Sequence, residues 1–154
     1  MKIEVLTICR RPPRWVTEQT DDYLKRLPRE FLPSFVHLAP GHDGAAVAVR
    51  QRDEATRLLK RAHKNSPVVA LDEHGWAGTS IEFAARLDSF RSTTGHLTFI
   101  IGGADGLHDS VLQHAHSRWS LSKLTLPHLL VQIVLAEQLY RAWSILERHP
   151  YHRA

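Results

Sequence analysis

The chain has 154 residues, of which 43% are hydrophobic and 23% charged, and it carries a formal net charge of +4. This length suits one domain whose core needs neither disulfides nor a metal, and the single cysteine, Cys9, excludes an intramolecular disulfide framework. The basic balance permits an acidic partner such as nucleic acid without requiring one. Residues 1–8 are too short and too charged for a secretory signal, so we expect a cytoplasmic protein.

Short apolar runs alternate with longer segments of helical period along the chain. The runs with strand character are, in order, 2–8, 34–39, 67–71, 97–101 and 118–121. The segments of helical period are 14–27, 45–64, one that begins at Thr79, 109–116 and 127–146. This alternation predicts a single domain, residues 1–154, of the α/β class, with a mostly parallel sheet flanked by helices.

Two of these helices carry more specific signals. Thr79 followed by Glu82 predicts a capping box at the start of the third helix. The second helix ends in a basic patch that is a candidate contact for RNA phosphates, made of Arg57, Lys60, Arg61 and Lys64.

The last helix, which Pro127 opens, is apolar around most of its circumference as far as Leu146. Such a helix is buried on more than one side, and in a chain this small we expect the second side to face another subunit. Glu137 and Arg141 interrupt the apolar run, so we expect no membrane crossing. Their i, i+4 spacing favours a local ion pair, while the alternative is that Arg141 faces a ligand pocket or a substrate phosphate.

Three loops follow the later strands, after Leu71, Ile101 and Leu121, and ligands of parallel α/β sheets bind at that edge. The glycines of 102–106 allow close backbone approach to a ligand, although their spacing matches neither a dinucleotide fingerprint nor a phosphate loop. The segment 121–126 offers two hydroxyls framed by leucines, which suits an adenine or a thioether better than a phosphate. From the residues alone, each loop could also be a plain connector.

Metal and thiol chemistry find little support in the sequence. His114 and His116 are spaced i, i+2 and so do not share a helix face, and neither a paired-cysteine nor an HExxH motif is present. We expect no metal site. Cys9 has no recognisable base partner, so we expect a buried thiol rather than a nucleophile.

Four stretches, in this order and spacing, resemble the ribosomal RNA large subunit methyltransferase H family, which are small SPOUT-class enzymes. They are IIGGADGL at 100–107, WSLSKLTLPH at 119–128, EQLYRAWSI at 137–145 and HPYHR at 149–153. The total length, the opening around Pro13 and Trp15, and the Leu71-Asp72 pair also match, so the resemblance covers essentially the whole chain.

The resemblance implies a homodimeric α/β methyltransferase with a C-terminal trefoil knot and S-adenosyl-L-methionine as cofactor. The substrate it implies is a pseudouridine in helix 69 of 23S rRNA, methylated at N3 within the assembled ribosome. Two rival functions stay open: methylation of a different RNA nucleotide by the same kind of enzyme, and ribosome binding without catalysis.

The resemblance also assigns a set of cofactor-binding residues. They are Leu71, Gly102, Leu121, Ser122, Lys123, Leu124, Thr125 and Leu126. Chemical type and nearness to that run give a second set, the candidate catalytic residues, with no individual roles assigned. They are His128, Arg141, Tyr151, His152 and Arg153.

Overall fold

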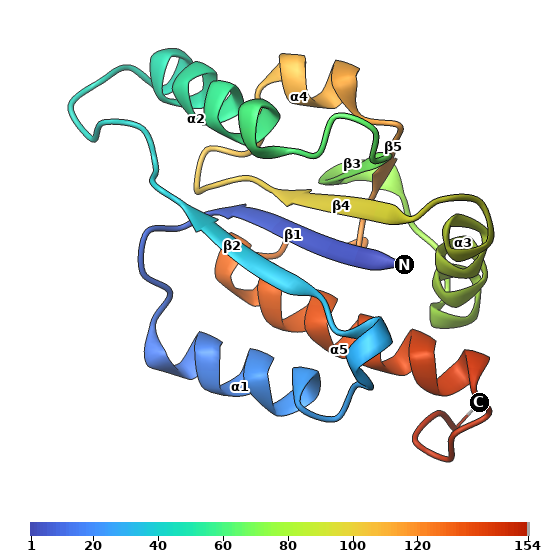
Figure 1. Ribbon diagram of the computed structural model, residues 1–154. Coiled ribbons are helices and arrows are strands. Elements are labelled where there is room, and N and C mark those ends of the chain that lie inside the picture. Colours follow the sequence, from blue (N-terminus) through green and yellow to red (C-terminus); the bar gives the residue numbers. More distant parts are fainter. Residues whose placement is uncertain (154) are drawn as a thin grey trace.

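The computed structural model describes residues 1–153 and places five parallel strands in one sheet (Figure 1). The strands are β1 (Lys2–Ile8), β2 (Ser34–Leu38), β3 (Val68–Trp76), β4 (His96–Ile101) and β5 (Ser117–Trp119). Their order across the sheet is β2-β1-β4-β3-β5, and every neighbouring pair is parallel. The predicted α/β class is confirmed. Ala154, the last residue of the predicted domain, lies outside the described residues.

Helices cover both faces of this sheet (Figure 1). They are α1 (Arg14–Leu24), α2 (Val47–Arg61), α3 (Ser80–Thr93), α4 (Asp109–His114) and α5 (His128–Leu146), with a short 3-10 turn, η1, at Arg29–Phe31. Because strand side chains alternate between faces, β1 sends Val5 into a cluster with α1, α3 and α5, and Leu6 into one with α2 and α4. Two packed cores result, one on each side of the sheet.

The largest difference from the sequence-based expectation is in β3, which continues to Trp76 although a polar loop was predicted from Asp72. The strand is irregular there, because Leu71 and Trp76 both pair with Trp119 of β5. The Ser120 N–H then donates to the Trp76 carbonyl at 2.7 Å. A Cβ on Gly75 would lie 2.7 Å from the Trp119 nitrogen, so this close crossing requires glycine. Exposed polar residues in the extension hid its strand character from the sequence pattern.

Helix ends follow the predicted signals more closely. Thr79 caps α3 in a complete capping box, in which its hydroxyl accepts from the Glu82 N–H and the Glu82 carboxylate accepts from the Thr79 N–H. Pro127 is the residue immediately before the first turn of α5, where its missing N–H leaves no hydrogen bond unmade. The helices α1 and α2 end at Leu24 and Arg61, a few residues before the predicted ends.

By length and composition alone, α5 is apolar enough to cross a membrane. In the fold it packs against α1, α3 and β4, and its Leu135, Ala136 and Leu139 have no exposed surface. A core helix with these contacts is equally apolar, so its composition is explained by packing.

Candidate functional site

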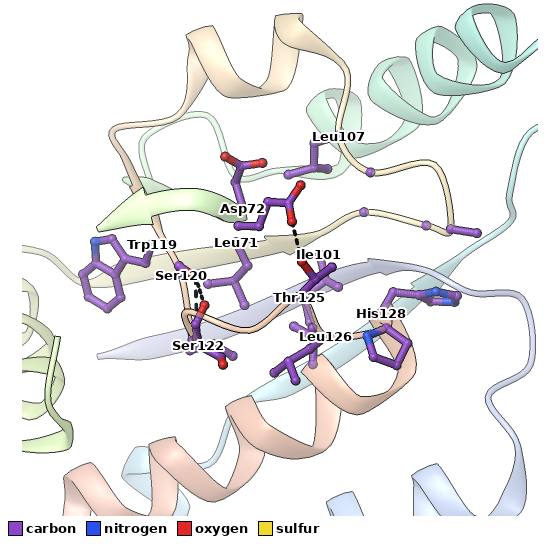
Figure 2. Close-up of a pocket in the computed structure, with 18 of the residues that line it drawn as sticks. Leu71, Asp72, Ile101, Leu107, Trp119, Ser120, Ser122, Thr125, Leu126 and His128 are labelled. Carbon is purple, nitrogen blue, oxygen red and sulfur yellow. Dashed lines mark hydrogen bonds between the residues drawn. The ribbon is translucent and has the colours of Figure 1, made fainter. Parts of the chain in front are cut away.

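Residues 71–73 of β3 and the loops that follow β4 and β5 meet at the carboxyl edge of the sheet, where they line a cavity of about 610 Å³ together with the start of α5 (Figure 2). The predicted loops after Ile101 and Leu121 therefore contribute to one site, whereas in place of the predicted loop after Leu71 the extension of β3 lines the cavity. The volume is in the range of small-molecule and cofactor pockets, and the position is the one at which open α/β sheets bind ligands.

The glycine loop that follows β4 forms one wall of the cavity. Gly102 is buried against the other end of the same loop, where an added Cβ would lie 2.8 Å from the backbone carbon of Gly106. The Gly106 N–H donates to the Gly103 carbonyl at 3.1 Å, which closes the turn. Only a residue without a side chain fits Gly102 while the loop keeps this shape.

Helix α2 holds the glycine loop from outside, a role that the sequence analysis missed. The Arg50 guanidinium makes a two-point contact with the Asp105 carboxylate at 3.0 and 3.2 Å. The Gln51 side-chain amide donates to the Asp105 carbonyl at 2.6 Å. The remaining Arg50 nitrogen donates to the carbonyl of Ala45 at 2.8 Å. Planar, bidentate contacts of this kind fix geometry as well as adding energy, so the loop is preorganised.

The second wall is the segment between β5 and α5. Its hydroxyls mostly hold the segment itself: the Ser120 hydroxyl donates to the Ser122 carbonyl at 2.6 Å, and the Ser122 hydroxyl accepts from the Leu124 N–H at 2.9 Å. The Thr125 hydroxyl donates to Glu73 at 2.9 Å, which ties this segment to the extension of β3 (Figure 2). The hydroxyls thus set the shape of the wall.

Seven of the eight predicted cofactor-binding residues line the cavity. They are Leu71, Gly102, Leu121, Ser122, Leu124, Thr125 and Leu126. The eighth, Lys123, is exposed and is not part of the lining. The cavity walls are largely apolar, and the charged side chains among the lining residues are the carboxylates of Asp72, Glu73 and Asp105. Apolar walls with acidic groups suit a ligand that combines an aromatic base with a positive charge.

The predicted catalytic residues separate into two groups. His128 lines the cavity, and its burial lowers the pKa of the imidazole while the charge of Glu54 acts in the opposite direction. Arg141 lies thirteen residues further along α5, which at about 1.5 Å per residue places it roughly 20 Å away. Within one chain, the structure does not bring these two residues to one centre.

Arg141 belongs to a cluster around Glu137 at the far end of α5. Its guanidinium donates twice to Glu137 Oε1, at 2.8 and 2.5 Å, so the predicted i, i+4 ion pair is formed. The Tyr151 hydroxyl donates to the same oxygen at 3.1 Å, and the Arg141 guanidinium lies 5.0 Å from the centre of its ring. Burial, with the neighbouring carboxylate, raises the pKa of Tyr151 to about 12. His152 is half-buried next to this cluster in sequence, and Arg153 is exposed.

The predicted basic patch is only partly available to a ligand. Arg61 pairs with Glu4 at 2.6 Å, and Arg57 donates to the carbonyls of Ala39 and Pro40. Intramolecular contacts therefore occupy both guanidinium groups of the patch. The other two cations, Lys60 and Lys64, are exposed. Among residues 1–153, no group of three or more potential ligands could hold a metal ion.

Comparisons with known proteins agree with this geometry. Residues 1–152 match the family model described as predicted SPOUT methyltransferase. The chain is 45% identical to the ribosomal RNA large subunit methyltransferase H of Chromohalobacter salexigens, over 99% of this chain and all of that protein. It is 44% identical to the protein of that name from Neisseria gonorrhoeae, over 99% of both chains.

Two solved structures share the fold at low sequence identity. A probable methylase family protein from Haemophilus influenzae aligns with 99% of this chain and 70% of its own, with a TM-score of 0.57 and 13% identity. A putative methyltransferase from Legionella pneumophila, in complex with the bound cofactor SAM, aligns with 90% of this chain and 65% of its own, with a TM-score of 0.52 and 10% identity. The fold, the loops that build the cavity and the full-length relatives lead to one conclusion: the chain belongs to the SPOUT methyltransferases, in the ribosomal RNA large subunit methyltransferase H family.

Proposed function

We propose that this methyltransferase transfers the methyl group of S-adenosyl-L-methionine to N3 of a pseudouridine in helix 69 of 23S rRNA. The substrate is the assembled ribosome in the cytoplasm, and the working form is a homodimer with the C-terminal trefoil knot that the family resemblance implies. The observation that carries this proposal is the cavity, because the family's motifs at 71, 102 and 121–126 converge on it from β3 and from two separate loops.

The cavity fits the proposed cofactor by chemistry as well as by position. Leu71, Leu121 and Leu126 supply apolar surface for the adenine, while the tight turn that Gly102 permits shapes the facing wall. The cofactor brings an electrophilic methyl group on a positively charged sulfur. Asp72 and Glu73 at the cavity match that positive charge.

The proposed homodimer is supported by exposed apolar side chains on α1 and α5, two helices that lie side by side on one face of the sheet (Figure 1). Trp15 on α1 is 48% exposed and Leu130 on α5 is 38% exposed. Large exposed apolar side chains on adjoining helices are typical of an interface. A second subunit is also the route by which the cluster around Arg141 can reach a cavity, since its own lies roughly 20 Å away.

The chain's contribution to the reaction is alignment and proton removal. N3 of pseudouridine carries a proton that must leave for the nitrogen to attack, and a base or a nearby cation lowers that barrier. His128 in the cavity, Arg141 of α5 and Arg153 of the tail are of the right types. We propose that the tail acts on the partner's cavity together with Tyr151 and His152.

Mass spectrometry of 23S rRNA from a deletion strain tests the substrate. The N3-methyl group on pseudouridine of helix 69 should disappear in the deletion strain and return when the gene is restored. Methylation of another nucleotide would replace the proposed target, and unchanged rRNA would contradict the function.

Truncation of residues 151–154, or Arg153→Ala alone, tests the role of the tail. We expect methylation of purified ribosomes to be abolished while calorimetric binding of S-adenosyl-L-methionine is retained. Full turnover by the truncated protein would remove the tail from the mechanism. A protein that binds ribosomes yet takes up no cofactor would favour the non-catalytic alternative.

A further inference from the structure

Glu54 is a buried acidic side chain that the proposed mechanism does not use. It projects from the middle of α2 and is 5% exposed. Its Oε1 accepts the Gly41 N–H at 3.0 Å, while its Oε2 is buried without a hydrogen-bond partner among the described residues. A buried carboxylate oxygen without a partner is costly, so its retention calls for a compensating positive charge.

The unpartnered oxygen lies against the glycine loop of the cavity. It is 3.6 Å from the position that a Cβ would occupy on Gly103, and Gly103 lines the cavity. His128 lines the same cavity, and the Glu54 carboxylate is the charged group that acts on its imidazole. Figure 2 shows the His128 ring below the glycine loop. The acid is therefore placed behind the cavity wall that the glycine loop forms.

Several other polar groups lie near the start of α5. One turn beyond His128, the Gln132 side-chain oxygen lies 3.2 Å from His37 Nε2 on β2. Burial raises the pKa of the Cys9 thiol, which follows β1, while the neighbouring Gln132 side chain acts in the opposite direction. Asp105 of the glycine loop is held by Arg50. Asp72 and Glu73 also line the cavity, from the extension of β3, where the Thr125 hydroxyl donates to Glu73. Among these carboxylates, Glu54 is the one whose charge acts on the imidazole of His128.

We propose that His128 accepts the proton of the nitrogen that becomes methylated, and that Glu54 is a positioning residue whose charge stabilises the resulting imidazolium. The inference rests on the proposed function. The nitrogen forms a bond to the methyl carbon, the carbon–sulfur bond breaks with its electron pair moving to sulfur, and the N3 proton passes to the imidazole and then to solvent. A buried carboxylate behind a histidine base supports proton removal in this way.

The substitution Glu54→Gln tests the coupling, because it removes the charge but keeps an oxygen that can accept the Gly41 N–H. Without that negative charge the imidazolium is less stable, so the pKa of His128 should fall by about one unit when followed by NMR titration. The neighbouring Asp53 is exposed on the same helix, and Asp53→Asn serves as the matched control, in which the pKa of His128 should not move. An unchanged pKa in Glu54→Gln overturns the inference.

The pH profile of ribosome methylation tests the role in the reaction. A base must be unprotonated to act, so the rate of the wild-type enzyme should rise with pH through the pKa of His128. In Glu54→Gln the midpoint should move to lower pH and the plateau should fall by up to about tenfold, since a base whose pKa is lower by one unit drives proton transfer less well. A lowered rate with an unmoved midpoint would indicate a structural role only and would overturn the inference.

Two further measurements keep the result decisive. Circular dichroism and cofactor binding establish whether Glu54→Gln is folded. If it is not folded, the pH profile of His128→Asn decides. A methylation rate that still rises with pH in that variant overturns the inference. If the wild-type enzyme leaves N3 of pseudouridine unmodified, the proposed function fails. The NMR titration still reports whether Glu54 acts on His128, so the two failures are distinguishable.

Discussion

The substitution Gly102→Ala should weaken cofactor binding while leaving the chain folded. The added Cβ would lie 2.8 Å from the backbone carbon and 2.9 Å from the backbone oxygen of Gly106, about 0.6 Å inside the 3.4 Å at which ordinary contact begins. These are backbone atoms that cannot rotate away, so the loop must open to relieve the clash. Overpacking of this kind costs about 1–3 kcal/mol. Because cofactor binding has to close the loop again, the Kd should rise by roughly 5- to 150-fold.

Isothermal titration calorimetry with S-adenosyl-L-methionine measures this effect, and Gly95→Ala is its matched control. Gly95 lies in the turn before β4, and an added Cβ there meets nothing within 4 Å. The control should keep the wild-type Kd and change the unfolding free energy by no more than about 1 kcal/mol. If Gly102→Ala binds the cofactor as tightly as Gly95→Ala does, the glycine loop is not the cofactor wall and the reasoning fails.

Three other substitutions test separate parts of the structure. Arg50→Lys replaces the planar two-point contact with Asp105 by a single ammonium, so calorimetry should show cofactor binding weakened by about tenfold, and an unchanged Kd would show that the clamp is dispensable. Thr79→Ala removes the cap of α3 and should lower the unfolding free energy by about 1 kcal/mol in urea titrations, without altering cofactor affinity. Tyr151→Phe should abolish the absorbance transition of one tyrosine near pH 12. Because the folded pKa lies above the ordinary value near 10, the contribution of Tyr151 to stability is complete below about pH 10 and declines as pH rises towards 12. A wild-type transition near pH 10 would contradict that burial.

The elements that could be predicted from the sequence were those with a local physical cause. The parallel strands are continuous apolar runs, and the cap at Thr79 needs only a hydroxyl and a glutamate three residues apart. The extension of β3 to Trp76 has no such cause. It exists because Gly75 lets β5 approach closely, and that contact joins residues more than forty positions apart. Local pattern cannot report a pairing set by a distant strand.

The candidate site divides in the same way. The cavity loops were predictable because ligand sites of parallel sheets lie at one edge, and the family motifs fall there. The support from α2 could not be predicted, because Arg50 and Glu54 are polar residues of a helix whose sequence pattern is typical of a solvated surface helix. Their burial follows from how α2 packs over the glycine loop. Arg50 and Glu54 are spaced i, i+4, which shows that they share a helix face but not what that face contacts.

The division of the candidate catalytic residues between the two ends of α5 bears on why the helix is so apolar. A helix that only closed the core would need one apolar face, yet α5 keeps Leu130 exposed, and Trp15 of the neighbouring α1 is exposed as well. At one end α5 supplies His128 to the cavity, and at the other it holds Arg141 in a fixed position through Glu137. Fixing a guanidinium costs side-chain entropy, which is repaid when the group meets a defined anion. If two copies pack through this face, each cavity can receive the fixed cation of the other chain. Charge reversal at Arg141 should then abolish methylation by a homodimer of that variant. Mixing the variant with a chain whose cavity is inactive should restore part of the activity. A mixture without activity would show that a single chain supplies both the cavity and the Arg141 cation.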